Sequence, residues 1–245
     1  MSAFFQTRYA RLVDSPNGTH IWWHSMPLPD GTRVNGQNPD KDLQLKKWHA
    51  MQIPSAGGLD GRHVLDIGAN DGFFSIAALM AGAASVTSVD SAWGTWPHNI
   101  GYASRVWEVA PEIVTADFRT HAFPRRYDTI FLLGVLYHLQ DVFGCMGRMA
   151  ALLADGGQLY LETQMAQVQS ELPVFECASD IYPTVARQGK ESLGSVGISN
   201  FLFPNEHAMR NLAHAYDFRL ETLEGPHNAY TRENPTRRVF LLRRN

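Results

Sequence analysis

Three polar positions that could bind a ligand each follow a short apolar run of the sequence. The stretch 68–72, Gly-Ala-Asn-Asp-Gly, comes after the first run and leads into a helical pattern, while Asp90 and Asp117 end the next two runs. Glycines allow a sharp turn and a close approach to a ligand. Open α/β sheets bind ligands beyond the carboxyl ends of their strands. We therefore predict a nucleoside site, in which Asp90 accepts from the ribose hydroxyls, Asp117 accepts from an adenine amino group and Phe118 lies against the base.

Each of these residues also has an ordinary structural interpretation. The glycine-rich stretch is compatible with a tight strand-to-helix turn, and Asp90 with a helix cap. Trp93 is equally compatible with covering the adenine and with packing between helix and sheet. NAD(P) is the rival ligand, but the full Gly-x-Gly-x-x-Gly spacing is missing and Tyr137 is not followed by lysine four positions later. The dehydrogenase interpretation is therefore disfavoured.

Alternating strand and helix patterns must position these residues. Strands are expected at 64–68, 85–90, 113–117, 128–134 and 157–162, and helices at 73–83, 96–109 and 142–154. A later helix from about 205 to 215 is followed by strand patterns at 219–223 and 239–242. The prediction is an α/β fold: a Rossmann-like three-layer sandwich whose seven-stranded, mostly parallel sheet ends in a C-terminal antiparallel hairpin.

Two parts of the chain fall outside this alternation. Residues 1–60 are rich in aromatic residues, Pro and Gly, with a turn at Asp30-Gly31 and a short helix expected at 42–51. We interpret them as an N-terminal appendage that packs over the active site of the domain 61–245. Residues 165–204 have no clear period and predict a lid-like insertion in that domain.

The composition is that of a globular enzyme. The 245 residues are 44% hydrophobic and carry a formal net charge of −3, which does not favour nucleic-acid binding. Cys145 and Cys177 lack a metal-ligand spacing and are interpreted as small buried residues, so no metal is expected. The sequence has neither a signal-peptide core nor an apolar stretch that could span a bilayer. We expect a cytoplasmic protein, and a homo-oligomer is left open.

Two stretches carry a resemblance to a known family. Residues 65–75, Leu-Asp-Ile-Gly-Ala-Asn-Asp-Gly-Phe-Phe-Ser, resemble motif I of class I S-adenosylmethionine (SAM)-dependent methyltransferases. Residues 134–139, Gly-Val-Leu-Tyr-His-Leu, are more specific and resemble the group of the tRNA wobble-uridine carboxymethyltransferase and the mo5U-type methyltransferases. His24 with its Pro-Asp-Gly turn, residues 161–163 and residues 200–205 fit the same group in order. The likeness extends from about residue 20 to the C-terminus.

The resemblance implies SAM as cofactor and places Tyr137 near its sulfonium end. In the carboxymethyltransferases a late arginine, which maps best onto Arg237 and second best onto Arg238, helps to hold the extra carboxylate of carboxy-SAM. A lysine in a Lys-Gly-Pro-Phe stretch and a longer N-terminal part have no counterpart in this sequence. We therefore expect ordinary SAM and a smaller acceptor. The expected cofactor contacts are Asp66, Gly68, Ala69, Asn70, Gly72, Asp90, Ser91, Trp93, Asp117, Phe118 and Gly134.

Methyl transfer chiefly requires the acceptor, methyl carbon and sulfur to be held in line with water excluded. His138 is the candidate base and Tyr137 the candidate positioning group. Trp22, His24 and Arg237 are the expected acceptor-side residues. The structural alternatives are a histidine bonded to a backbone carbonyl, tryptophans that fix the appendage to the core, and exposed edge-strand arginines.

Three functions compete at this point. The first is O- or N-methylation of a small molecule, with a place in specialised metabolism expected. The second is modification of the tRNA wobble uridine, as in the similar enzyme. The third is chemistry on SAM itself, namely cyclisation of its aminobutyryl arm with release of methylthioadenosine. The acidic charge balance favours the first.

Overall fold

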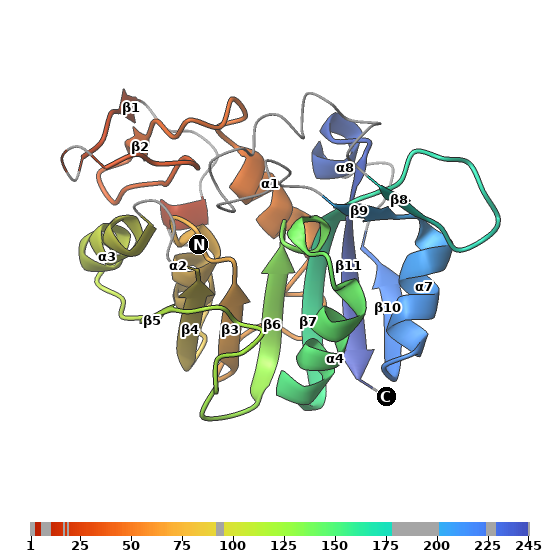
Figure 1. The fold of residues 1–245 in the computed structure, drawn as a ribbon. Helices are drawn as coiled ribbons and strands as arrows, with labels where there is room; N and C mark the ends of the chain where they lie inside the picture. The colour runs from red at the N-terminus through yellow and green to blue at the C-terminus, as the bar shows by residue number, and fades with distance from the viewer. Residues whose placement is uncertain are drawn as a thin grey trace. The chain divides into compact units, whose positions relative to one another are not determined.

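The computed structural model describes residues 3–5, 11–16, 18, 20–91, 96–177, 201–223 and 229–244 (Figure 1). The chain divides into two compact units, Met1–Ala122 and Phe123–Asn245. Both units combine β-strands with helices packed against them. Among the described residues, none of the helices is both long and apolar enough to cross a membrane.

The main-sheet strands of the first unit are parallel and follow the order β3-β4-β5. β3 (His63–Ile67), β4 (Ser85–Asp90) and β5 (Glu112–Thr115) form where β-branched and other apolar residues dominate. β3 and β4 are buried along most of their length, as parallel strands usually are. The three expected strands are thus confirmed, although β5 ends two residues before Asp117.

The helices of the first unit end earlier than the sequence pattern indicated. α1 (Leu43–Ala50) matches its expectation, whereas α2 (Phe73–Met80) and α3 (Trp96–Val106) both stop about three residues short. A residue with positive φ closely follows each of the two shortened helices: Gly82 at +96° and Glu108 at +54°. A left-handed residue ends a helix, so the apolar residues beyond these ends belong to turns.

The N-terminal part of this unit is irregular. η1 (Ala3–Phe5) places Phe4 against Phe73 of α2, and β1 (Leu12–Val13) pairs in parallel with β2 (Arg33–Val34). The expected turn at Asp30-Gly31 is present, with Gly31 at φ +80°. These elements belong to the same compact unit as β3 to β5, so a boundary near residue 60 stays a prediction.

The sheet of the second unit has the order β10-β11-β7-β6. β6 (Tyr127–Leu133) and β7 (Leu153–Gln164) are parallel, whereas β11 (Arg237–Arg244) is antiparallel to both β7 and β10 (Phe218–Thr222). The expected C-terminal antiparallel hairpin is confirmed. β7 begins four residues earlier than expected, and its pairing with β6 shifts register between Tyr127 and Thr129.

Two helices of this unit begin at side-chain caps. Asp141 accepts a hydrogen bond from the N–H of Gly144 at the start of α4 (Val142–Leu152), and Asn205 accepts one from the N–H of Ala208 at the start of α7 (Glu206–His214). The expected helix at 142–154 therefore ends two residues early, where β7 begins. The unit also contains η2 (Leu136–His138) and α8 (Ala229–Glu233).

The insertion contains a strand pair that the sequence pattern did not reveal. β8 (Phe175–Cys177) and β9 (Leu202–Pro204) are antiparallel and three residues long each, too short for a recognisable alternation. Residues 178–200 lie outside the described residues. Cys145 is buried as expected, but Cys177 is exposed, because it lies in this peripheral pair rather than in the core.

Together the two units supply the seven strands of an α/β Rossmann-like fold, mostly parallel and closed by the antiparallel C-terminal strands. The predicted fold class is confirmed.

Candidate active site

The turn from β3 to α2 has the backbone that the glycine-rich stretch predicted. Gly68, Asn70 and Gly72 have φ values of +73°, +48° and +85°, a region that glycine occupies freely and asparagine tolerates. A Cβ atom on Gly72 would lie 2.4 Å from Cγ1 of Ile100 on α3. The turn therefore requires glycine both for its conformation and for its contact with α3.

Asp90 lies beside this turn, as its position at the end of β4 indicated. Its Oδ2 accepts a hydrogen bond from the backbone N–H of Asn70 at 2.9 Å, and its Oδ1 accepts one from the N–H of Ser91 at 2.8 Å. These bonds fix the carboxylate at the carboxyl end of a parallel strand. A carboxylate held in this place has the chemistry to accept the two hydroxyls of a ribose.

Asp66 is buried within the unit, with 1% of its surface exposed. Ser75 donates to its Oδ2 at 2.6 Å, and Ser88 in turn donates to Ser75 at 2.7 Å. Burial raises the pKa of Asp66 to about 7, since it outweighs the opposing effect of the Ser75 hydrogen bond. These contacts show Asp66 supporting the turn through α2 and β4; a direct contact with the cofactor stays a prediction.

Asp71 is a site residue that the sequence analysis did not single out. Its Oδ2 accepts hydrogen bonds from the backbone N–H groups of Trp23 at 2.8 Å and His24 at 2.7 Å, and its Oδ1 accepts one from Nδ2 of Asn99 at 2.8 Å. The sequence signal for Asp71 was its position among apolar residues, because a buried carboxylate requires hydrogen-bond donors around it. Its partners could not be identified from the sequence, since two of them lie 47 and 48 residues earlier.

The remaining predicted cofactor residues of the first unit differ in their surroundings. Asp117 is partly exposed and pairs with Arg119, whose Nε and Nη2 lie 2.9 Å and 2.6 Å from its carboxylate oxygens. This hydrogen bonding lowers the pKa of Asp117. Phe118 is 9% exposed, and Ala69 packs with residues of α3. Trp93 lies outside the described residues, so both interpretations of it stay open.

The segment that contains Trp22 and His24 packs on α3 in the same unit. Trp22 is buried and packs edge to face on Tyr102. This contact is of the kind expected if the tryptophan fixes the N-terminal appendage to the core. Its neighbour Trp23 is 49% exposed. His24 is half-buried. Its backbone N–H donates to Asp71 and so holds it beside the glycine-rich turn. Acceptor contacts of Trp22 and His24 stay predictions.

The second unit brings Tyr137 and Arg237 together, whereas the cofactor contacts that the family resemblance implied for them stay predictions. Nη2 of Arg237 donates to the Tyr137 hydroxyl at 3.1 Å, and the guanidinium lies 4.9 Å from the centre of the tyrosine ring. Nη1 of Arg237 donates to Oε1 of Glu162 at 2.9 Å, and the Tyr230 hydroxyl donates to the same oxygen at 2.5 Å. Arg238 instead donates to the backbone carbonyls of Pro235 and Arg237.

This group, which we call the Tyr137 network (Tyr137, Glu162, Tyr230 and Arg237), is largely buried. Glu162 and Tyr230 are 0% exposed and Tyr137 is 7% exposed. Burial raises the pKa of Tyr137, against the opposing influence of Arg237, and raises that of Tyr230 well above its usual range. Both phenols therefore keep their protons at neutral pH. Glu162 and Tyr230 were not among the predicted site residues, although a glutamate inside an apolar strand was the available signal.

His138 follows Tyr137 in η2 and is half-buried. The two rings lie 4.2 Å apart and are tilted by 49°. Gly134, at the end of β6, has a φ of +79° and donates its N–H to the carbonyl of Glu162 at 3.0 Å. The chain thus turns sharply out of the sheet before reaching the Tyr137-His138 pair.

The described residues contain no candidate metal centre. Within those ranges, three or more His, Cys, Asp or Glu side chains do not gather where they could hold a metal ion.

Comparison with known proteins defines the class of this protein. A family model described as a methyltransferase domain matches residues 36–223. The chain belongs to this family and is a SAM-dependent methyltransferase, which confirms the enzyme class and the cofactor that its sequence predicted. The residues present fit that cofactor, because the β3–α2 turn lacks side chains at both glycines and Asp90 is fixed beside it.

Several similar curated proteins carry the name tRNA U34 carboxymethyltransferase. The one from Psychrobacter arcticus is 29% identical over 58% of this chain and 45% of its own length. The one from Methylococcus capsulatus is 32% identical over 49% of this chain and 37% of its own length. The chain thus spans less than half the length of these relatives.

Solved structures share the fold at lower identity. The N-terminal domain of EvdMO1, with bound S-adenosylhomocysteine (SAH), has a TM-score of 0.64 at 15% identity and covers 91% of this chain and 92% of its own. Magnesium protoporphyrin IX methyltransferase from Synechocystis PCC 6803 has a TM-score of 0.56 at 18% identity, over 83% of each chain. At such identities these structures establish the fold alone.

Proposed function

We propose that this methyltransferase methylates an oxygen or nitrogen atom of a small molecule. The observation that carries the proposal is the enclosure of Tyr137, which is 7% exposed and bonded to Arg237. A reaction next to this hydroxyl takes place largely shielded from water, where a small acceptor group can enter and be oriented. In the same unit a cleft of about 760 Å³ is lined by residues 165–171, 205–207, 235–236 and Arg238. Arg238, which lines this cleft, follows Arg237 in β11.

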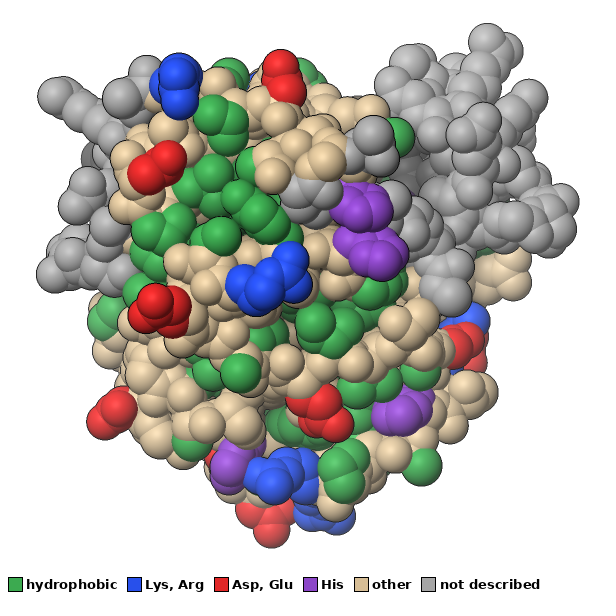
Figure 2. Space-filling view, turned by 90° about the vertical axis from the view of Figure 1, so that its left-hand side faces the viewer, with side chains coloured by type: hydrophobic (Ala, Val, Ile, Leu, Met, Phe, Trp, Pro, Cys, Tyr) green, Lys and Arg blue, Asp and Glu red, His purple; other side chains and the backbone are tan. Residues whose placement is uncertain are grey.

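Charge supports a small acceptor over RNA. The sequence has 24 acidic against 21 basic residues. Figure 2 shows the side of the first unit that carries α3, where basic side chains are interspersed with acidic ones rather than gathered in a stripe. RNA-binding surfaces usually concentrate Lys and Arg on one face.

We further propose a division of tasks among the predicted residues. When bound, SAM supplies an electrophilic methyl group on its sulfonium. The β3–α2 turn and Asp90 hold the nucleoside, with the other predicted contacts of the first unit around it. Tyr137 keeps its proton because burial raises its pKa, so it donates a hydrogen bond and orients the acceptor. His138, whose type titrates near neutral pH, is the base that removes the acceptor proton.

The proposal also includes the two irregular parts of the chain. Residues 1–60 pack over the cofactor turn of their own unit, for which the Asp71 hydrogen bonds to Trp23 and His24 give support. Residues 165–204 act as a lid over the acceptor, supported by the position of residues 165–171 in the lining of the cleft.

Mass spectrometry after incubation with SAM and a metabolite extract tests this proposal. The expected result is SAH together with a small molecule that has gained one methyl group. Release of methylthioadenosine without SAH would instead indicate attack on the aminobutyryl arm and would overturn methyl transfer.

A second candidate function is modification of the tRNA wobble uridine. It is favoured by the names of the similar curated proteins, at about 30% identity. Nucleoside analysis of tRNA incubated with the enzyme and SAM, in parallel with carboxy-SAM, decides between the candidates. A newly modified uridine would replace the small-molecule proposal.

A further inference from the structure

Asp71 ties together three parts of the first unit that are distant in sequence. It lies in the cofactor turn, yet its carboxylate accepts hydrogen bonds from the backbone of Trp23 and His24 and from the side chain of Asn99 on α3. Only 3% of its surface is exposed. A carboxylate buried this deeply is stable only when donors surround it, and here most of those donors belong to the N-terminal segment.

Asn99 extends the same connection. Its Nδ2 donates both to Asp71 and to the carbonyl of Ile21, at 2.8 Å and 2.7 Å, and the side chain is fully buried. The two bonds use both hydrogens of the amide and fix its orientation. The segment 21–24 is thus attached at Ile21, Trp23 and His24 to one acid and one amide.

The other edge of the segment is also fixed. The N–H groups of Gln37 and Asn38 donate to the carbonyls of Trp22 and Trp23 at 2.8 Å. A Cβ atom on Gly36 would lie 2.3 Å from the carbonyl carbon of His24, so the chain packs closely there. The segment is therefore held between residues 36–38 and the cofactor turn.

Within this fixed segment Trp23 is an exposed aromatic residue. It is 49% exposed and its neighbour Ile21 is 58% exposed, whereas Trp22 between them is buried. Its ring lies edge to face with His24, 6.4 Å between centroids. A large aromatic side chain that is exposed beside a nucleoside-binding turn buries apolar surface when it covers a ligand, and this burial favours binding.

We propose that Asp71 is a positioning residue, which holds the segment 21–24 against the cofactor turn so that Trp23 and His24 close over the bound cofactor. The inference rests on the SAM site of the family and is independent of the acceptor. It links the strength of cofactor binding to the three hydrogen bonds of one carboxylate.

The proposal implies a pH dependence. Burial raises the pKa of Asp71 to about 6, against the hydrogen bonds from His24, Asn99 and Trp23, while the negative charge of Asp90 adds to the rise. A protonated Asp71 would need an acceptor at its new O–H. Asn99 could supply one only by turning its amide, which would break its bond to Ile21. Protonation near pH 6 therefore exchanges these hydrogen bonds for relief of the buried charge, so the attachment changes as the pH crosses about 6.

The test uses the full chain and SAH, which can be titrated by calorimetry without an acceptor. For D71N we expect affinity for SAH about tenfold weaker at pH 7.5 and amide exchange at residues 21–24 about tenfold faster, as the loss of one or two hydrogen bonds predicts. Wild-type affinity should show a step near pH 6, between pH 7.5 and 5.5, that D71N lacks. If Asp71 contributed to stability alone, D71N would keep the same step in SAH affinity as the wild type.

Controls separate positioning from folding. D60N changes an exposed aspartate of the same unit and should match the wild type in affinity, amide exchange and pH profile. N99A removes the donor to Asp71 together with the donor to the Ile21 carbonyl, and should change SAH affinity and amide exchange in the same direction as D71N. W23A keeps the backbone hydrogen bonds, so it should weaken SAH binding without faster exchange. If D71N fails to fold, the SAH affinities and amide exchange of N99A and W23A test the proposal in its place.

Wild-type affinity and pH profile in D71N, or in both N99A and W23A, would overturn the proposal. Because the measurement contains no acceptor, that outcome would leave the small-molecule assignment standing.

Discussion

At the scale of single residues, the Tyr137 network provides the sharpest prediction. Y137F removes the hydroxyl that Arg237 contacts but keeps the ring beneath the guanidinium. We expect SAH affinity to change less than about threefold, while methyl transfer slows about tenfold to hundredfold, as for loss of one positioned hydrogen-bonding group. Rates of SAH formation in an extract that supports turnover provide the measurement.

The matched control is Y160F. Tyr160 is likewise a buried tyrosine, with 0% of its surface exposed, but its hydroxyl lies 3.3 Å from Gln158, outside the Tyr137 network. It should keep its transfer rate. An equal loss in both variants would show that Tyr137 acts through packing alone.

Asp66 predicts a pH dependence of stability. Its pKa of about 7 in the folded protein exceeds the ordinary value of 3.8, so between these values the folded state binds more protons than the unfolded state. Stability contributed by this group is therefore complete below about pH 4 and falls as the pH rises to 7, by up to about 4 kcal/mol. D66N keeps an acceptor for Ser75 and cannot ionise.

Chemical denaturation at several pH values tests this expectation. The free energy of unfolding of D66N should depend less on pH between 4 and 7 than that of the wild type. Parallel curves for the two proteins would mean that Asp66 does not titrate in this range.

The residue scale also shows what spacing can and cannot predict. Asp90 was found because it ends a strand, and the carboxyl ends of parallel strands share one edge. Asp71 and Glu162 escaped notice because their importance comes from partners distant in sequence: Trp23 and His24 for one, Tyr230 and Arg237 for the other. Periodicity does not encode such contacts.

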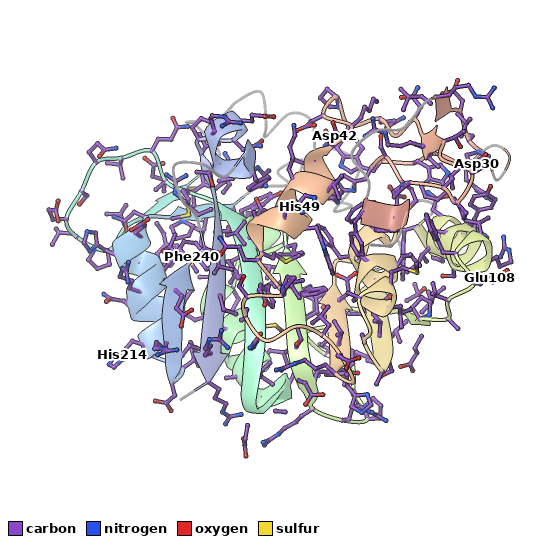
Figure 3. All side chains as sticks on the ribbon, turned by 180° about the vertical axis from the view of Figure 1, so that it is seen from behind. Asp30, Asp42, His49, Glu108, His214 and Phe240 are labelled. Carbon is purple, nitrogen blue, oxygen red and sulfur yellow. The ribbon has the colours of Figure 1, made fainter. Side chains whose placement is uncertain are left out.

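At the scale of elements, β11 holds the centre of the sheet of the second unit. Phe240, labelled in Figure 3, is fully buried and lies opposite Leu161 of β7 and Thr222 of β10. F240A should lower the free energy of unfolding by about 3–5 kcal/mol, through lost burial and the cavity left behind. Denaturant titration followed by circular dichroism measures the loss.

Leu172 offers the contrast, since 72% of its side chain is exposed. L172A should stay within about 0.5 kcal/mol of the wild type. A loss for F240A as small as this would mean that β11 contributes little to the core.

Element boundaries were predictable where a long apolar pattern met a turn signal. β3 and β4 match their expected positions, because buried parallel strands are continuous apolar runs. The ends of α2 and α3 were placed too late, since left-handed residues such as Glu108 stop a helix without an obvious signal. β8 and β9 carry only three residues each, so tertiary pairing rather than local pattern forms them.

At the scale of the whole molecule, the fold class followed from the alternation of strands and helices, but the division into units did not. The sequence suggested a boundary near residue 60, where composition changes. The two compact units of the structure divide the chain between residues 122 and 123, after β5 and before β6, and the boundary near residue 60 stays a prediction. Side-chain packing defines such units, and Phe4 in η1 already packs on Phe73 of α2 in the first of them.

The charge of the whole chain leads to the last prediction, which concerns RNA. A protein that neutralises several phosphates releases counterions, so its affinity falls steeply with salt, by about 10³–10⁵ between 50 and 200 mM for six to ten contacts. With 24 acidic and 21 basic residues, this chain should not be retained on immobilised tRNA at 50 mM salt. Excess tRNA should likewise change the rate of methyl transfer to a small acceptor by less than about twofold. Retention at 50 mM that is lost by 200 mM, together with inhibition by tRNA, would instead reveal a phosphate-binding surface that the net charge conceals and would favour the tRNA function.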